Sequence, residues 1–162
     1  MKVIPLLLWL TLPTSSLAQA SASAPGTAAV TTSGAFFALS VADVRASAKW
    51  YSEKLGMAVV MDAPKQEKAS VIVLEGGGLI VELIQHDDAV PLNTAAPGLK
   101  SNILLHGVVK AGAIVADLDR TLATLRQRNV QIAFGPYPAR ANQRANVIIQ
   151  DNAGNLIQFF GR

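Results

Sequence analysis

A strand followed by a helix occurs twice in this sequence, and this repeat limits the folds that the chain can adopt. Each copy is an apolar run that ends in Val-Ala-Asp, at residues 41–43 and again at residues 115–117. The aspartate of each triplet is well placed to cap the helix that follows, because its carboxylate can accept from the first free backbone N–H groups. The sequence therefore predicts two similar modules in tandem.

The first module, residues 34–86, is predicted to contain one helix and four strands. The helix spans residues 44–55 and places Val44, Ala48 and Tyr51 on one apolar face, and Gly56 suits a left-handed C-cap. Strands are expected at residues 36–41, 57–61, 70–74 and 79–86, with a polar loop at residues 64–68. The glycines at 76–78 lack a following Lys-Ser/Thr and a helix, so they predict a hairpin turn rather than a phosphate-binding loop.

The second module, residues 105–162, repeats this order. Its helix, residues 118–128, has Leu118, Leu122 and Leu125 on its inner face. Strands are expected at residues 108–115, 130–134, 145–150 and 155–160, with a long loop at residues 135–143. Residues 87–101 contain prolines, a glycine and several small residues, so they are predicted to link the two modules.

The amino-terminal residues have the pattern of a secretory signal peptide. Met1-Lys2 is followed by an apolar run, Val3–Leu12, and then by Ala18-Gln19-Ala20. We expect residues 1–20 to be removed by cleavage after Ala20, because this triplet matches the small-residue cleavage pattern. An uncleaved anchor is the weaker interpretation, since the run is too short for a comfortable membrane span. Residues 21–33 resemble a flexible linker, and the product is expected to be periplasmic or secreted, with no membrane association after cleavage.

Composition excludes several classes of function. The chain contains no cysteine, which rules out thiol catalysis and thiolate metal sites. The formal net charge is +3, and the basic residues are interleaved with acidic ones. This is not the clustered basic surface that nucleic-acid binding requires, so no nucleic-acid partner is expected.

The order of the predicted elements, the two Val-Ala-Asp helix starts and the ending Asp-Asn-Ala-Gly-Asn-Leu-Ile-Gln-Phe at residues 151–159 resemble the vicinal oxygen chelate superfamily. That superfamily includes glyoxalase I, bleomycin- and fosfomycin-resistance proteins and extradiol dioxygenases. The resemblance covers residues 34–162 and implies an α+β fold, in which two tandem βαβββ modules form a cup-shaped, eight-stranded mixed sheet with outer helices. It leaves open whether the cup forms within one chain or across a homodimer.

The resemblance also indicates where a divalent metal would bind. Metalloenzymes of this superfamily take ligands, usually His and Glu, from the first and last strands of each module. The matching positions here are Phe36, Glu82, Lys110 and Gln158. Phenylalanine cannot ligate and an ammonium group is a poor ligand, so one carboxylate and one amide oxygen do not make a divalent site. We therefore expect no metal cofactor, and these residues become candidates for contact with a ligand.

The two histidines do not restore a metal site. His86 lies four residues beyond Glu82, which is on the order of 13 Å along a strand and too far for one ion to bridge. His106 stands in the same relation to Lys110. Both histidines are better explained as rim or surface residues.

Glu82 and Lys110 are the most informative pair in the sequence. Strand alternation places both among apolar or small neighbours, where a charge is costly unless it is paired. Two interpretations stay open: a polar anchor or acid/base pair at the floor of a ligand pocket, or a salt bridge that replaces a metal and has no substrate. Gly112 is expected to leave room beside Lys110.

Three hypotheses about function follow. The first is an exported protein that binds a small molecule in its cup without a metal. The second is a lyase, isomerase or dioxygenase with an atypical metal site, and the third is a structural or interaction module with a filled cup. The sequence identifies no catalytic residue. Tyr137, Arg140 and Arg144 could meet an acidic ligand as a lid, although a solvated loop explains them better.

Overall fold

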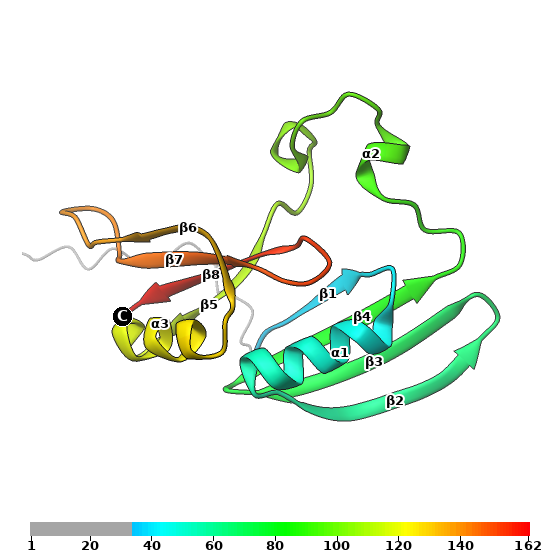
Figure 1. Ribbon diagram of the computed structural model, residues 1–162, viewed down its shortest axis with the longest axis horizontal. Coiled ribbons are helices and arrows are strands. Elements are labelled where there is room, and N and C mark those ends of the chain that lie inside the picture. The colour runs from blue at the N-terminus through cyan, green and yellow to red at the C-terminus, as the bar shows by residue number, and fades with distance from the viewer. Residues whose placement is uncertain (1–33) are drawn as a thin grey trace, which may run out of the picture. The chain divides into compact units, whose positions relative to one another are not determined.

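The computed structural model describes residues 34–162. The predicted signal peptide, residues 1–20, and the predicted linker, residues 21–33, lie outside the described residues. Within residues 34–162 the chain forms the two βαβββ modules that the sequence predicts (Figure 1). None of the helices in this range is long and apolar enough to cross a bilayer.

The first module consists of β1 (Phe36–Ser40), α1 (Val44–Trp50), a π-helical turn (Tyr51–Leu55), β2 (Ala58–Gln66), β3 (Ala69–Gly76) and β4 (Leu79–His86). Its strands form a four-stranded mixed sheet, sheet A, in the order β1-β4-β3-β2. β1 runs parallel to β4, and the other neighbours are antiparallel. The chain then continues through α2 (Leu92–Ala95) and a short 3-10 helix (Asn102–Leu104).

The second module consists of β5 (Ala111–Val115), α3 (Leu118–Gln127), β6 (Gln131–Tyr137), β7 (Asn146–Gln150) and β8 (Leu156–Gly161). Its strands form sheet B in the order β5-β8-β7-β6, which repeats the topology of sheet A. β5 is parallel to β8, and the other pairs are antiparallel. The eight strands therefore lie in two four-stranded mixed sheets.

The local signals that predicted the helices and the hairpin are confirmed. Asp43 Oδ1 accepts from the Ala46 N–H at 2.9 Å, and Asp117 Oδ1 accepts from the Arg120 N–H at 2.8 Å. Gly56 has φ +73° at the end of the first helical segment. In the hairpin between β3 and β4, Gly77 and Gly78 have φ of +59° and +81°. Two successive positive φ values are typical of the turn that joins two tightly paired strands.

The core lies on the helix-covered faces of the two sheets. Its members are apolar side chains from alternate strand positions and from the inner faces of the helices, among them Val44, Ala48, Tyr51, Leu74, Val81, Leu83, Leu122, Leu125, Val147, Ile149, Ile157 and Phe159. Because strand side chains alternate between faces, the other face of each sheet remains open. Phe36, for example, is 66% exposed on sheet A. A ligand site on either sheet would therefore lie on these open faces.

A buried polar contact joins the two modules. The Tyr51 hydroxyl, fully buried in the core, donates to Asp151 Oδ2 at 3.0 Å. Asp151 Oδ1 accepts from the backbone N–H groups of Ala153 and Asn155, so the same carboxylate also shapes the turn between β7 and β8. Burial, reinforced by the negative charge and hydrogen bond of Asp151, raises the pKa of Tyr51 far above its ordinary value.

Several predicted boundaries are wrong, and two share one cause. β2 continues to Gln66, into the predicted loop at 64–68, and β6 continues to Tyr137, into the predicted loop at 135–143. Both extensions contain a proline, Pro64 and Pro136. β2 and β6 are edge strands of their sheets. The outer side of an edge strand pairs with no other strand, so it tolerates proline, which has no backbone N–H to donate.

The start of β5 and the end of the first helix also differ from prediction. β5 begins at Ala111 rather than at residue 108, so Lys110 precedes the strand. The Val109 carbonyl instead accepts from Asn102 Nδ2 at 3.2 Å, which ties this stretch to the 3-10 helix. The first helix is α-helical only to Trp50, and its last turn, residues 51–55, is π-helical. The predicted linker at residues 87–101 contains α2.

Candidate functional site

The open face of sheet B holds a pocket of about 350 Å³. It is lined by side chains from β6, β7 and β8, from the loop between β6 and β7, and from the residue that precedes β5: Lys110, Tyr137, Arg140, Gln143, Asn146, Ile148 and Gln158. The strand register explains this grouping, because Gln158 lies between Gly112 of β5 and Ile148 of β7. Lys110 and Gln158, predicted from the sequence as site residues, therefore come together, and Tyr137 and Arg140 of the suggested lid join them.

Two side-chain amides lie buried beside this pocket. Asn146 is 2% exposed and Gln158 is 7% exposed. Gln158 Nε2 donates to Asn146 Oδ1 at 2.8 Å, and Asn146 Nδ2 donates to the backbone carbonyl of Arg144 at 3.1 Å. Asn146 was missed in the sequence. The only signal for it there is a polar residue at the start of an apolar strand, on the same strand face as Ile148 and Gln150.

The other two predicted site residues lie on the open face of sheet A. Glu82 is half-buried, and its neighbour on β1 is Ala38, whereas Phe36 is next to Ile80. No ion pair joins Glu82 to Lys110 within residues 34–162. The pocket that Lys110 lines contains Gln158 and not Glu82. Glu82 and Lys110 thus form no ion pair in the described part of the chain, and Lys110 lines one pocket with the amides of sheet B.

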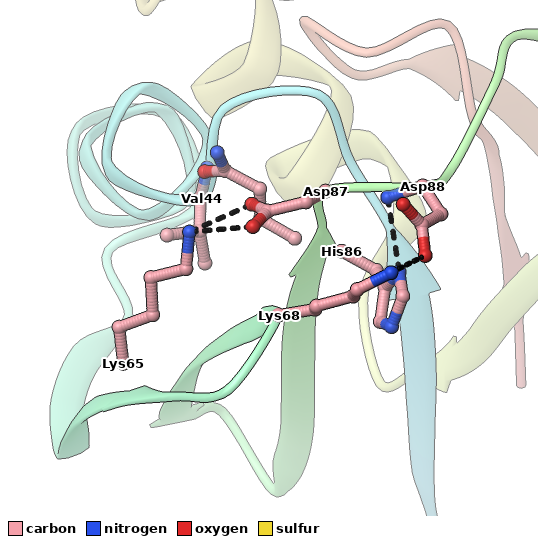
Figure 2. Close-up of polar contacts among 7 residues, drawn as sticks. Val44, Lys65, Lys68, His86, Asp87 and Asp88 are labelled. Carbon is pink, nitrogen blue, oxygen red and sulfur yellow. Dashed lines mark hydrogen bonds and ion pairs between the residues drawn. The ribbon is translucent and has the colours of Figure 1, made fainter.

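His86 belongs to a surface cluster at the end of β4. Figure 2 shows His86 beside the ion pairs Lys65–Asp87 and Lys68–Asp88. The His86 Nδ1 atom accepts from the backbone N–H of Asp88 at 3.1 Å, so this nitrogen helps to shape the turn that leaves the strand. His106 is exposed in the segment before β5. Neither histidine lines the pocket on sheet B.

The donor set at the predicted positions does not fit a divalent metal. Ala38 and Gly112, the β1 and β5 neighbours of Glu82 and Gln158, carry no donor in their side chains. Glu82 is the one carboxylate at these positions, and a divalent site needs several oxygen or nitrogen ligands. Nowhere in residues 34–162 do three His, Cys, Asp or Glu side chains gather closely enough to hold an ion. The absence of a metal cofactor stays a prediction.

A second cavity, of about 450 Å³, lies between the first helical segment and α3. Most of its lining is apolar, and Lys54, Asp117 and Arg120 are its charged residues. Two of these are already engaged: Asp117 caps α3, and Lys54 Nζ donates to the backbone carbonyl of Arg128 at 2.6 Å. None of the site residues predicted from the sequence lines this cavity. The pocket on sheet B is therefore the better candidate site.

Comparison with known families agrees with this architecture. The family model of the Glyoxalase/Bleomycin resistance protein/Dioxygenase superfamily matches residues 35–159. The chain belongs to this superfamily. The resemblance inferred from the helix starts and the carboxyl-terminal motif is thereby confirmed. A comparison with curated proteins gives no significant match.

Solved structures show the same fold at low sequence identity. A glyoxylase/bleomycin resistance protein/dioxygenase domain from Frankia sp. EAN1pec superimposes with a TM-score of 0.62 at 17% identity, covering 83% of this superfamily member and 93% of that chain. The glyoxalase family protein from Enterococcus faecalis gives 0.61 at 16% identity, with coverages of 77% and 94%. TnmS3, an antibiotic binding protein from Streptomyces sp. CB03234, gives 0.55 at 21% identity, with coverages of 83% and 98%.

Proposed function

We propose that this superfamily member binds a small organic molecule in the pocket on the open face of sheet B, without a divalent metal among the binding groups. The observation that carries this proposal is the pair of buried amides, Asn146 and Gln158, beside an open pocket. Buried polar side chains are costly unless they are paired, and here they lie beside a concavity rather than in the apolar core. The volume of about 350 Å³ is in the range of small-molecule sites.

The fold of TnmS3 supports binding as the function. TnmS3 is described as an antibiotic binding protein, and it shares this fold over 98% of its length. Capture of a ligand needs a shaped pocket and a few polar groups, both of which are present on sheet B. Metal-dependent lyase, isomerase or dioxygenase chemistry has less support, because the strand neighbours of Glu82 and Gln158 are Ala38 and Gly112, whose side chains carry no donor.

A screen of antibiotics and small metabolites by thermal unfolding tests the proposal. A ligand present at one hundred times its Kd stabilises the folded state by about 2.7 kcal/mol, which raises Tm by several degrees. The variant Ile148→Trp should abolish this shift, because the indole would fill the pocket beside Gln158. Val73→Trp is the matched control, since Val73 pairs with Glu82 on sheet A as Ile148 pairs with Gln158 on sheet B.

The outcomes of this screen are distinct. Binding that is lost in Ile148→Trp and retained in Val73→Trp supports the pocket on sheet B. A compound that binds both variants as tightly as the wild type would place the site elsewhere. If no compound raises Tm, and native mass spectrometry of freshly purified protein shows no bound molecule, the proposed function is wrong.

We further propose that the protein acts outside the cytoplasm. The support is the sequence Ala18-Gln19-Ala20 after a short apolar run. Amino-terminal sequencing of the protein from the periplasm or medium should start at Ser21. A mature protein that still begins at Met1 would contradict export by cleavage.

A further inference from the structure

The hydrogen bonds beside the pocket fix which atoms it presents. Asn146 Nδ2 donates to the Arg144 carbonyl at 3.1 Å, and a backbone carbonyl can only accept. The Asn146 amide therefore has one orientation, with Oδ1 toward Gln158. Gln158 must then offer its NH₂ group, and Nε2 donates to Asn146 Oδ1 at 2.8 Å.

This orientation leaves the Gln158 carbonyl oxygen available to a ligand. Within residues 34–162 no group donates a hydrogen bond to Gln158 Oε1, and no fully buried side-chain oxygen or nitrogen lacks a partner. Oε1 is therefore not sealed in the core, and the residue that carries it lines the pocket. Gln158 is 7% exposed as a residue, so a ligand that donates to Oε1 would supply a hydrogen bond to a largely buried group.

The charged groups around the same pocket are all positive. Lys110 and Arg140 line it, and no aspartate or glutamate does. Neither cation forms an ion pair with a carboxylate of the described part of the chain. Both side chains are exposed, so an incoming anion would meet them without displacing a partner. Guanidinium and ammonium groups together favour a carboxylate or a phosphate.

We propose that the pocket selects a small organic anion that also carries an O–H or N–H donor. The donor binds Gln158 Oε1, and the carboxylate or phosphate lies at Lys110 and Arg140. Tyr137, which lines the pocket and is 44% exposed, offers a ring face to the body of the ligand. This inference rests on the proposed function and adds the chemical class of the ligand.

Matched probe compounds test each half of this proposal by calorimetric titration. The probes are the ortho, meta and para hydroxybenzoates, with their methyl esters, which lack the charge, and their methoxy analogues, which lack the donor. The corresponding hydroxyphenyl phosphates form a second arm that separates carboxylate from phosphate recognition. We expect at least one isomer of one arm to bind, and loss of either group to raise Kd on the order of tenfold.

Variants connect the probes to the pocket. Lys110→Met should remove the preference for the acid over its ester, while Lys100→Met, which removes the same charge from an exposed position outside the pocket, should retain it. Gln158→Met should remove the preference for hydroxyl over methoxy compounds. If that variant does not fold, the probe series on the wild type still tests whether a hydrogen-bond donor on the ligand contributes to binding. Esters and methoxy analogues that bind as tightly as the parent acids would overturn this inference. The inference would also be overturned if neutral compounds from the screen bind and no acid does. In both cases the proposed function, binding of a small molecule, would still be supported. If no compound of any class binds, both proposals fail.

Discussion

Tyr51 should make the folded state sensitive to alkaline pH. Its side chain is fully buried, and its hydroxyl donates to Asp151 Oδ2 at 3.0 Å. Burial and the neighbouring carboxylate raise the pKa of Tyr51 far above 10.0 in the folded protein. Above pH 10 the unfolded chain therefore loses this proton while the folded chain keeps it.

The sign and the size of the effect follow from proton linkage. Because the unfolded state binds fewer protons above pH 10, the free energy of unfolding decreases as pH rises. The stabilisation is complete below pH 10. At pH 11 the loss from this one group is about 1.4 kcal/mol, and each further unit costs about the same again until the folded protein also ionises.

Urea unfolding from pH 8 to pH 11.5 measures this dependence. Tyr51→Phe should be less stable than the wild type at pH 8 by about 1.5 kcal/mol, because Asp151 loses one of its donors. Its stability should then fall less steeply above pH 10, so the two curves converge. Tyr137→Phe removes an exposed phenol and is the matched control, with the wild-type slope expected. Parallel curves for wild type and Tyr51→Phe would refute the assignment of a buried, protonated Tyr51.

Two further predictions concern the strand pairing and the metal. Gly112→Ala should destabilise the protein by about 1–3 kcal/mol, because a Cβ there would overlap the backbone carbonyl oxygen of Gln158. The control Gly34→Ala should leave the stability unchanged in the same urea titration, because a Cβ at Gly34 would have nothing within 4 Å. Equal stability of the two variants would contradict the close approach of β5 to β8. Elemental analysis after dialysis should find no stoichiometric Zn, Ni, Fe or Mn. About one ion per chain that is lost in Glu82→Ala would overturn the metal-free interpretation.

Local chemistry made much of the fold predictable. The N-caps at Asp43 and Asp117, the C-cap at Gly56 and the glycine hairpin depend on residues close together in the sequence, and all are present in the structure. The strands that contain Pro64 and Pro136 were not predictable in the same way. Whether a strand tolerates proline depends on its place at the edge of a sheet, which is set by pairing with distant strands.

The candidate site was predictable only in part. Lys110 and Gln158 were identified as site residues, and the structure places both at one pocket. Asn146 was missed, because its role depends on the register that brings β7 beside β8. The pairing of Lys110 with Glu82 assumed that Lys110 is a strand residue facing a common cup. Lys110 instead precedes β5, and Gly112 is required by close strand approach rather than by room for a ligand.

Small-molecule binding on sheet B is tested most directly by amide chemical-shift changes in NMR spectra, recorded while the best compound of the screen is titrated into the protein. The largest changes should map to β6, β7 and β8 and to the residues of the pocket, with Lys110, Ile148 and Gln158 among them. They should saturate with one ligand per pocket and disappear in Ile148→Trp. Changes centred on the cavity lined by Lys54 and Arg120, or on the open face of sheet A around Glu82, would contradict this site.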